Sequence, residues 1–94
     1  MLVYLKCSLS EGFRASEKTA ELTRYDGRIA EIRLPANSFG EIEGENYMAA
    51  GLIEYHKSSD SYLVELPYEA DTGENRIWIR ANDVRLELPQ VVEQ

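Results

Sequence analysis

Residues 20–34 read AELTRYDGRIAEIRL, in which two runs of alternating apolar and polar residues flank the pair Asp26-Gly27. Alternation with a period of two is the pattern of a strand that buries one face. An Asp-Gly pair between two such runs is a strong signal for a tight β-hairpin. This stretch therefore predicts an antiparallel pair of strands, and it indicates an all-β fold.

The length of the hairpin loop decides which side chains share a face, because a slip of one residue turns every side chain of a strand over. A two-residue turn would pair Tyr25 with Arg28 and send the apolar residues of the two strands to opposite faces. A three-residue loop, residues 25–27, pairs Arg24 with Arg28 instead. It gathers five apolar side chains on one face: Ala20, Leu22, Ala30, Ile32 and Leu34. We therefore predict the three-residue loop, with Gly27 in the left-handed conformation that glycine adopts without strain.

The same alternation recurs on both sides of this hairpin. An earlier strand is predicted with four residues on its core face: Val3, Leu5, Cys7 and Leu9. Three later runs also predict strands: residues 47–57, 62–66 and 76–81. The segments between the strands are polar and predict loops: residues 10–18, 35–46, 58–61 and 68–75. Gly51 interrupts its strand and predicts a bend or a bulge there.

The turn at residues 58–61 connects two of these strands. Pairing Lys57 with Tyr62 turns four side chains to the core face: Ile53, Tyr55, Val64 and Leu66. In the last long strand the alternation directs three residues inward: Ile77, Ile79 and Ala81. Residues 81–84 then predict a single tight turn, and residues 85–88 a short final strand, with Leu86 and Leu88 alternating.

The C-terminal segments GLIEY (51–55), YLVEL (62–66), RIWI (76–79) and ANDV (81–84) resemble, in their order, an SH3-like barrel. That fold has three meandering strands, a one-turn 3₁₀ segment and a short closing strand. The resemblance spans residues 51–88 and implies architecture only, since the chain has no ALYDY-type segment and no tandem tryptophan before the third strand. We predict an SH3-like or related small barrel of five to six short antiparallel strands, forming one domain over residues 1–88 with a tail over residues 89–94.

Composition narrows the classes of function. Ninety-four residues suffice for one domain, and 17 acidic against 10 basic side chains give a formal charge of −7. Nucleic-acid binding relies on basic side chains that neutralise phosphates, so this acidity weighs against such a partner. The single cysteine, Cys7, excludes an internal disulfide, and no apolar run reaches the roughly 20 residues of a membrane helix. We expect a cytoplasmic protein that does not contact a membrane.

Residues suited to catalysis or metal binding are few. The only histidine, His56, is predicted on the outer face beside the serines of the next turn, whereas Cys7 is predicted to face the core. A nucleophile needs a base and an orienting group within reach, and the sequence offers no such set. Six loop carboxylates lack the spacing of a known calcium loop: Glu41, Glu43, Glu45, Glu69, Asp71 and Glu74. We therefore predict no catalytic residue, no metal and no cofactor, and a protein that is not an enzyme.

Trp78 is the strongest candidate for a binding residue. With Ile77 and Ile79 directed inward, Trp78 faces outward between Arg76 and Arg80. An aromatic ring between two guanidinium groups can stack on a nucleobase or contact a partner's aromatic or anionic group. The alternative is that a loop of the same domain folds over the indole, because large exposed aromatic side chains are uncommon on monomers.

Tyrosines of the second half add to this surface, since peptide-binding SH3-like domains use aromatic grooves flanked by acidic loops. Tyrosine also fills strands by propensity alone. We predict five binding residues: Arg76, Trp78, Arg80, Tyr55 and Tyr62. The predicted function is a non-catalytic interaction or accessory module that binds a protein partner. The alternative is a small nucleic-acid-binding barrel that uses the stripe of residues 76, 78 and 80.

Overall fold

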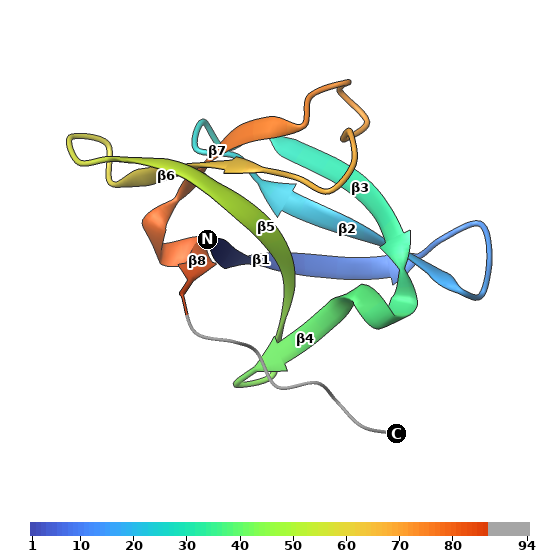
Figure 1. Ribbon diagram of the computed structural model, residues 1–94. Helices are drawn as coiled ribbons and strands as arrows, with labels where there is room; N and C mark the ends of the chain where they lie inside the picture. The colour runs from blue at the N-terminus through green and yellow to red at the C-terminus, as the bar shows by residue number, and fades with distance from the viewer. Residues whose placement is uncertain (87–94) are drawn as a thin grey trace.

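The computed structural model describes residues 1–86, in which eight antiparallel strands and two single-turn 3₁₀ helices form one curled sheet (Figure 1). The strands are β1 (Leu2–Glu11), β2 (Glu17–Thr23), β3 (Ile29–Pro35), β4 (Phe39–Ile42), β5 (Glu45–His56), β6 (Ser61–Glu65), β7 (Arg76–Arg80) and β8 (Val84–Arg85). The 3₁₀ helices are η1 (Ala36–Ser38) and η2 (Ala81–Asp83). The prediction of an all-β small barrel is confirmed, with more strands than the five or six expected.

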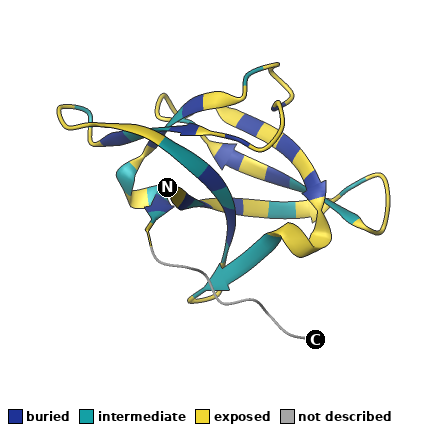
Figure 2. Ribbon diagram, viewed as in Figure 1, coloured by how far each residue is buried: buried dark blue, intermediate teal, exposed yellow. Residues whose placement is uncertain are grey.

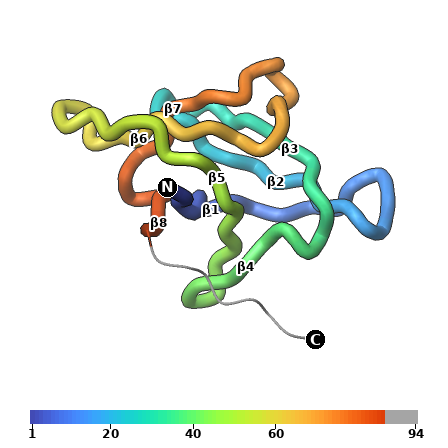
Figure 3. Tube along the Cα trace, in the orientation of Figure 1, coloured from blue at the N-terminus to red at the C-terminus, as the bar shows by residue number. Residues whose placement is uncertain are grey.

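Strands β1 and β5 organise the sheet, because each of them pairs with different neighbours along its length. They pair with each other from Leu2 opposite Gly51 to Cys7 opposite Asn46. The first part of β1 also pairs with β8, and its last part with β2. In the same way, β5 pairs first with β4 and then with β6. The sheet therefore curls into a half-barrel with the order β3-β2-β1-β5-β6-β7 (Figures 1 and 3).

Apolar side chains fill the interior of the half-barrel. Alternate residues of the strands point inward, and Figure 2 shows the resulting change between buried and exposed residues along β3. The largest of the fully buried side chains include Leu5, Leu22, Met48, Ile77 and Ile79. Cys7 lies in this core, as predicted, and burial raises the pKa of its thiol to about 12. The thiol therefore stays protonated and unreactive near neutral pH.

The hairpin of residues 20–34 has the predicted register. The backbone N–H of Arg24 donates to the carbonyl of Arg28 at 2.8 Å, which leaves a three-residue loop. Within that loop Gly27 has a φ of 89°, the left-handed conformation that was expected. All five side chains predicted on one face are buried: Ala20, Leu22, Ala30, Ile32 and Leu34. The choice of register by burial is therefore confirmed.

The segment of residues 35–46, predicted as a loop, is instead largely structured. It contains η1 and the strand β4, which pairs with β5 from Phe39 opposite Met48 to Ile42 opposite Glu45. The turn between these strands is only two residues long, and both Glu43 (φ 51°) and Gly44 (φ 81°) are left-handed, as two-residue hairpin turns require. Glutamate seldom adopts this conformation, so the turn carries no strong sequence signal. The predicted loop of residues 10–18 is also shorter, because β1 ends at Glu11 and β2 begins at Glu17.

The predicted register of the β5–β6 hairpin is wrong. The residue that pairs with Tyr62 is Tyr55, whereas the prediction paired Lys57 with Tyr62. A bulge between Leu52 and Glu54 adds Ile53 as an extra residue in β5, two positions beyond the glycine where we predicted it. Ile53 and Tyr55 are consequently exposed, by 41% and 47%, rather than buried. The outer end of the hairpin thus lies beyond the buried core, where Tyr55 is only partly covered, by the ring of Tyr62.

The C-terminal part follows the predicted order with different boundaries. Ala81 does not continue β7 inward but begins η2, and the closing strand β8 is only two residues long. Val84 is the buried residue of β8, and Leu86 is exposed by 55%. The predicted position of Leu88, the domain boundary and the tail of residues 89–94 lie outside the described residues.

Loop contacts join the two ends of the strand order. Asp71, in the loop between β6 and β7, donates its backbone N–H to the carbonyl of Glu31 at 2.8 Å. The Asp71 carboxylate also accepts the Glu31 backbone N–H at 2.9 Å. In the loop of the β2–β3 hairpin, the backbone N–H of Tyr25 donates to the carbonyl of Trp78 at 2.8 Å. These bonds hold the β2–β3 hairpin against β7 and the loop that precedes it.

Candidate functional site

The stripe of residues 76, 78 and 80 lies on the outer face of the sheet. Residues that pair across antiparallel strands share a face, and Trp78 pairs with Leu63 while Ile77 and Ile79 point into the core. Arg76 pairs with Glu65 and Arg80 with Ser61 on the same outer face. Trp78 is partly buried, so the indole is neither fully exposed nor covered. The structure thus brings together three of the five residues predicted to bind.

The β2–β3 loop forms one wall beside Trp78. Its position is fixed by the hydrogen bond from Tyr25 to the Trp78 carbonyl and by a second bond, in which Arg80 Nε donates to the carbonyl of Tyr25 at 3.1 Å. The Arg80 guanidinium also lies 5.9 Å from the centre of the Tyr25 ring, within the range of a cation–π contact. Tyr25 itself remains 41% exposed. The loop therefore approaches the indole without covering it.

His56, at the end of β5, forms the opposite wall. Its ring centre lies 5.9 Å from that of Trp78, and the two ring planes meet at 75°, edge to face. The imidazole Nδ1 is within hydrogen-bond distance of two turn hydroxyls, Ser59 Oγ at 3.0 Å and Ser58 Oγ at 3.2 Å. Ser59 Oγ in turn lies 2.6 Å from Ser61 Oγ, which is buried. The serines of the turn thus orient the imidazole toward the indole.

Together these side chains enclose a surface hollow of about 310 Å³, here called the Trp78 hollow, lined by Tyr25, His56, Ser59, Ser61 and Trp78. Three of the five lining side chains are aromatic rings, and they come from three separate segments of the chain. Apolar concave sites with a few polar groups are typical of ligand binding. The hollow can accept an apolar or planar group by stacking and by burial against the rings.

The charged groups near the Trp78 hollow differ in how they are paired. Arg76 forms an ion pair with Glu65, with Nη2 and Oε2 3.0 Å apart. Arg24 forms one with Glu74 at 2.6 Å, and this hydrogen bond raises the pKa of Arg24. The Arg80 side chain, by contrast, has no acidic partner within residues 1–86, and its contacts are with the backbone carbonyl and the ring of Tyr25. One exposed guanidinium beside the hollow is therefore free to meet a ligand.

Tyr55 and Tyr62, the other two residues predicted to bind, do not join this surface. Tyr62 pairs with Ile79 and packs against the core, so it lies on the opposite face of the sheet from Trp78. The Tyr55 ring lies beside it, with ring centres 4.9 Å apart. The Tyr55 hydroxyl donates to Asp60 at 2.6 Å, and this bond raises the pKa of Tyr55. The predicted set is thus divided between two faces.

Sequence reasoning missed Tyr25 and His56 as members of the site. Tyr25 was predicted in the hairpin loop, but nothing in the local pattern places that loop beside β7. His56 was predicted on the outer face beside the serines of the turn, but its approach to Trp78 follows from the observed register, which pairs His56 with Ser61. The one available signal was the aromatic residue at the tip of the strongest hairpin. Its significance depends on contacts between the ends of the sheet.

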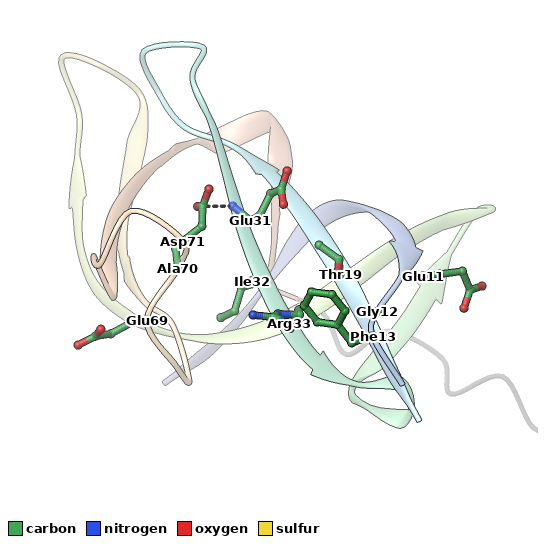
Figure 4. Close-up of a pocket in the computed structure, with 10 residues that line it drawn as sticks. All are labelled: Glu11, Gly12, Phe13, Thr19, Glu31, Ile32, Arg33, Glu69, Ala70 and Asp71. Atoms are coloured by element: carbon green, nitrogen blue, oxygen red, sulfur yellow. Dashed lines mark hydrogen bonds between the residues drawn. The ribbon is translucent and has the colours of Figure 1, made fainter. Parts of the chain in front are cut away.

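A second, larger depression of about 760 Å³ lies between the β1–β2 loop, β3 and the loop after β6 (Figure 4). Phe13 stands at its border, 89% exposed, with the Arg33 guanidinium 4.7 Å from the ring centre. Figure 4 shows Glu11 and Glu69 far apart and pointing away from the centre. Its carboxylates do not converge, so this depression is a broad polar surface.

The described part of the chain offers few side chains arranged for metal binding or for nucleophilic catalysis. Across residues 1–86, no group of three or more His, Cys, Asp or Glu side chains is arranged to hold a metal ion. No carboxylate hydrogen-bonds to His56 in this part of the chain, so the serine–histidine contact lacks the orienting group of a catalytic triad. None of the helices described is long and apolar enough to cross a membrane. Comparison with protein-family models, with curated proteins and with solved structures finds no match to this chain.

Proposed function

We propose that this domain is a non-catalytic interaction module that binds a protein partner through the Trp78 hollow. The observation that carries the proposal is the position of the only tryptophan, partly exposed in the interior of a strand and flanked by Tyr25 and His56. Tryptophan and tyrosine are enriched among the residues that dominate binding energy at protein interfaces. A side chain held on a paired strand also loses little conformational entropy when a partner binds.

We further propose that the half-barrel is an SH3-like barrel, as the sequence suggested. In support, β5, β6 and β7 form a meander, η2 follows as a single turn, and β8 pairs with β1. Peptide recognition by aromatic-lined grooves is one mode found among such folds, although the fold alone does not specify it. A cytoplasmic location remains part of this proposal.

The alternative of nucleic-acid binding has weaker support. Stacking of a base on Trp78 beside Arg80 is compatible with the hollow. Arg76, however, is engaged by Glu65, and the formal charge of the chain is −7. Because affinity for nucleic acid depends on several free cations along the phosphate backbone, we favour a protein partner.

Binding of partners to the full chain tests the proposal. The domain and its Trp78→Ala variant are immobilised, and proteins from the source organism are captured, cross-linked and identified. Tyr68→Ala is the matched control, since Tyr68 is 61% exposed and lies outside the hollow. We expect one or more proteins bound by the wild type and by the control but lost with Trp78→Ala. The proposal is contradicted if the wild type, Trp78→Ala and Tyr68→Ala all bind the same proteins. Should Trp78→Ala fail to fold, Tyr25→Ala repeats the test.

A further inference from the structure

We propose that the Trp78 hollow selects an acidic segment of its partner, with an apolar side chain between the aromatic rings and a neighbouring carboxylate on Arg80. This inference rests on the proposed function, because it names the ligand of the same hollow. It makes Arg80 the residue that determines specificity.

The first argument is the pairing of the arginines around the hollow. Arg24 is paired with Glu74, Arg76 with Glu65, and Arg28 lies 3.7 Å from Asp26. Arg80 has no carboxylate partner within residues 1–86. Arg14 and Arg33 also lack a carboxylate partner within residues 1–86, but neither contacts a residue of the Trp78 hollow, whereas Arg80 contacts its lining residue Tyr25. Charge complementarity therefore favours an anionic group at this position.

The second argument is the orientation of the Arg80 side chain. Its Nε–H is used by the carbonyl of Tyr25, which fixes the direction of the guanidinium plane. The four N–H bonds on the two Nη atoms remain available, and this is the fork that holds a carboxylate through two parallel hydrogen bonds. The side chain is thus positioned before a ligand arrives, and less entropy is lost on binding.

The third argument is the spacing between the two subsites. Trp78 and Arg80 are two residues apart on one face of β7, which separates them by about 7 Å. In an extended peptide, residues two positions apart share a face and have the same spacing, so an apolar residue at the hollow places the side chain two positions away beside Arg80. A leucine or proline two positions from a glutamate meets this requirement.

A polyanion fits the same surface less well. A phosphate chain that contacts Arg80 meets further carboxylates nearby, because Asp26 follows the lining residue Tyr25 and Asp60 lies between the lining residues Ser59 and Ser61. Each of these carboxylates repels further phosphates. A peptide needs only one or two anionic side chains, and these can be placed at Arg80 alone.

Tryptophan fluorescence tests the inference directly, because Trp78 is the only tryptophan. The probes are three capped tetrapeptides: acetyl-Glu-Leu-Pro-Glu-amide and its counterparts with glutamine or with lysine in place of both glutamates. Oligothymidylate serves as the nucleic-acid probe. We expect saturable changes in emission, with the glutamate peptide bound about threefold tighter than the glutamine peptide and the lysine peptide weakest. Added salt reduces the difference.

Variants of Arg80 give the decisive comparison. In Arg80→Glu the preference reverses, so that the lysine peptide binds best, and in Arg80→Gln the three peptides bind alike. Near-ultraviolet circular dichroism confirms that each variant is folded.

Equal binding of all three peptides to the wild type overturns the acidic preference but leaves the hollow as a peptide site. Absence of saturable binding by any peptide overturns the inference as well, and partner capture that does not depend on Trp78 removes the proposed function. Tighter binding of oligothymidylate than of any peptide assigns the hollow to nucleic acid. Emission that changes with protein concentration alone assigns it to a second copy of the chain.

Discussion

The backbone N–H of Tyr25 donates a hydrogen bond to the carbonyl of Trp78, although Tyr25 follows β2 and Trp78 lies in the last strand of the order β3-β2-β1-β5-β6-β7. This bond and the one from Arg80 Nε to the Tyr25 carbonyl connect the β2–β3 loop with β7, two of the segments that line the Trp78 hollow. The hollow exists only when the sheet has curled far enough to bring them together. Binding and closure of the half-barrel are therefore linked.

Trp78→Ala is expected to lower the free energy of unfolding by about 1–2 kcal/mol, less than the roughly 3–5 kcal/mol of a buried aromatic residue, because the indole is partly exposed. Its neighbour Ile77 is fully buried and serves as the control. Ile77→Ala is expected to cost about 2–5 kcal/mol. Urea denaturation followed by circular dichroism measures both, and equal losses would show that the indole acts mainly as a core residue.

Gly27→Ala is expected to destabilise the domain by about 1 kcal/mol. Gly27 has a φ of 89°, and an added Cβ meets no atom within 4 Å, so the cost is conformational and not steric. Gly51→Ala is the matched control. Gly51 lies in regular β5, and its added Cβ has ordinary contact distances to Glu65, 3.8 Å at the nearest. We expect that control to be neutral or slightly stabilising, and a loss at Gly51 as large as at Gly27 contradicts the assignment.

Asp71→Ala is expected to cost about 1 kcal/mol, because it removes the acceptor of the Glu31 backbone N–H. Asp71→Asn keeps a side-chain oxygen and should restore much of the loss. Amide hydrogen exchange at Glu31 gives a local measurement: we expect faster exchange with alanine than with asparagine. Unchanged exchange in both variants would mean that this contact does not hold the two ends of the sheet.

Cys7 is expected to make stability depend on alkaline pH. An ordinary thiol has a pKa of about 9.0, whereas burial raises the pKa of Cys7 to about 12. Between these values the unfolded chain loses a proton that the folded protein keeps. The free energy of unfolding contributed by this group is therefore constant below about pH 9 and falls as the pH rises further, by up to about 1.4 kcal/mol per pH unit. Cys7→Ala removes this contribution, so urea denaturation from about pH 8 to 11 should show a shallower decline than in the wild type.

The sequence predicts best where burial and turn chemistry agree. In the β2–β3 hairpin, Gly27 and five apolar side chains require the same register, and that register is observed. In the β5–β6 hairpin the predicted register rested on burial of Ile53 and Tyr55, which extend beyond the core. The bulge at Ile53 and the left-handed Asp60 (φ 49°) then shift the pairing. Isoleucine gives no signal of a bulge, and aspartate, although enriched in the left-handed conformation, adopts it too rarely to predict this turn.

The residues of the Trp78 hollow likewise differ in how far the sequence predicts their positions. The outward direction of Trp78 follows from alternation within one strand, and the structure has it on the outer face. The approach of Tyr25 and His56 follows from the closing of the sheet and from the β5–β6 register. Both are properties of the assembled fold. Local patterns therefore identify the central residue of the hollow and leave its walls undetermined.

The double pairing of β1 and β5 also has a kinetic consequence. Tyr4 of β1 pairs with Arg85, and Leu2 pairs with Gly51, so the central strands meet only after long loops have closed. Closing such loops costs chain entropy before any contact compensates for it. We expect the β2–β3 hairpin, with its three-residue loop, to form before the strand pairs that require the closing of long loops. We expect folding in the millisecond-to-second range of small all-β proteins, with a rate that Gly27→Ala slows more than Ile77→Ala does relative to their effects on stability.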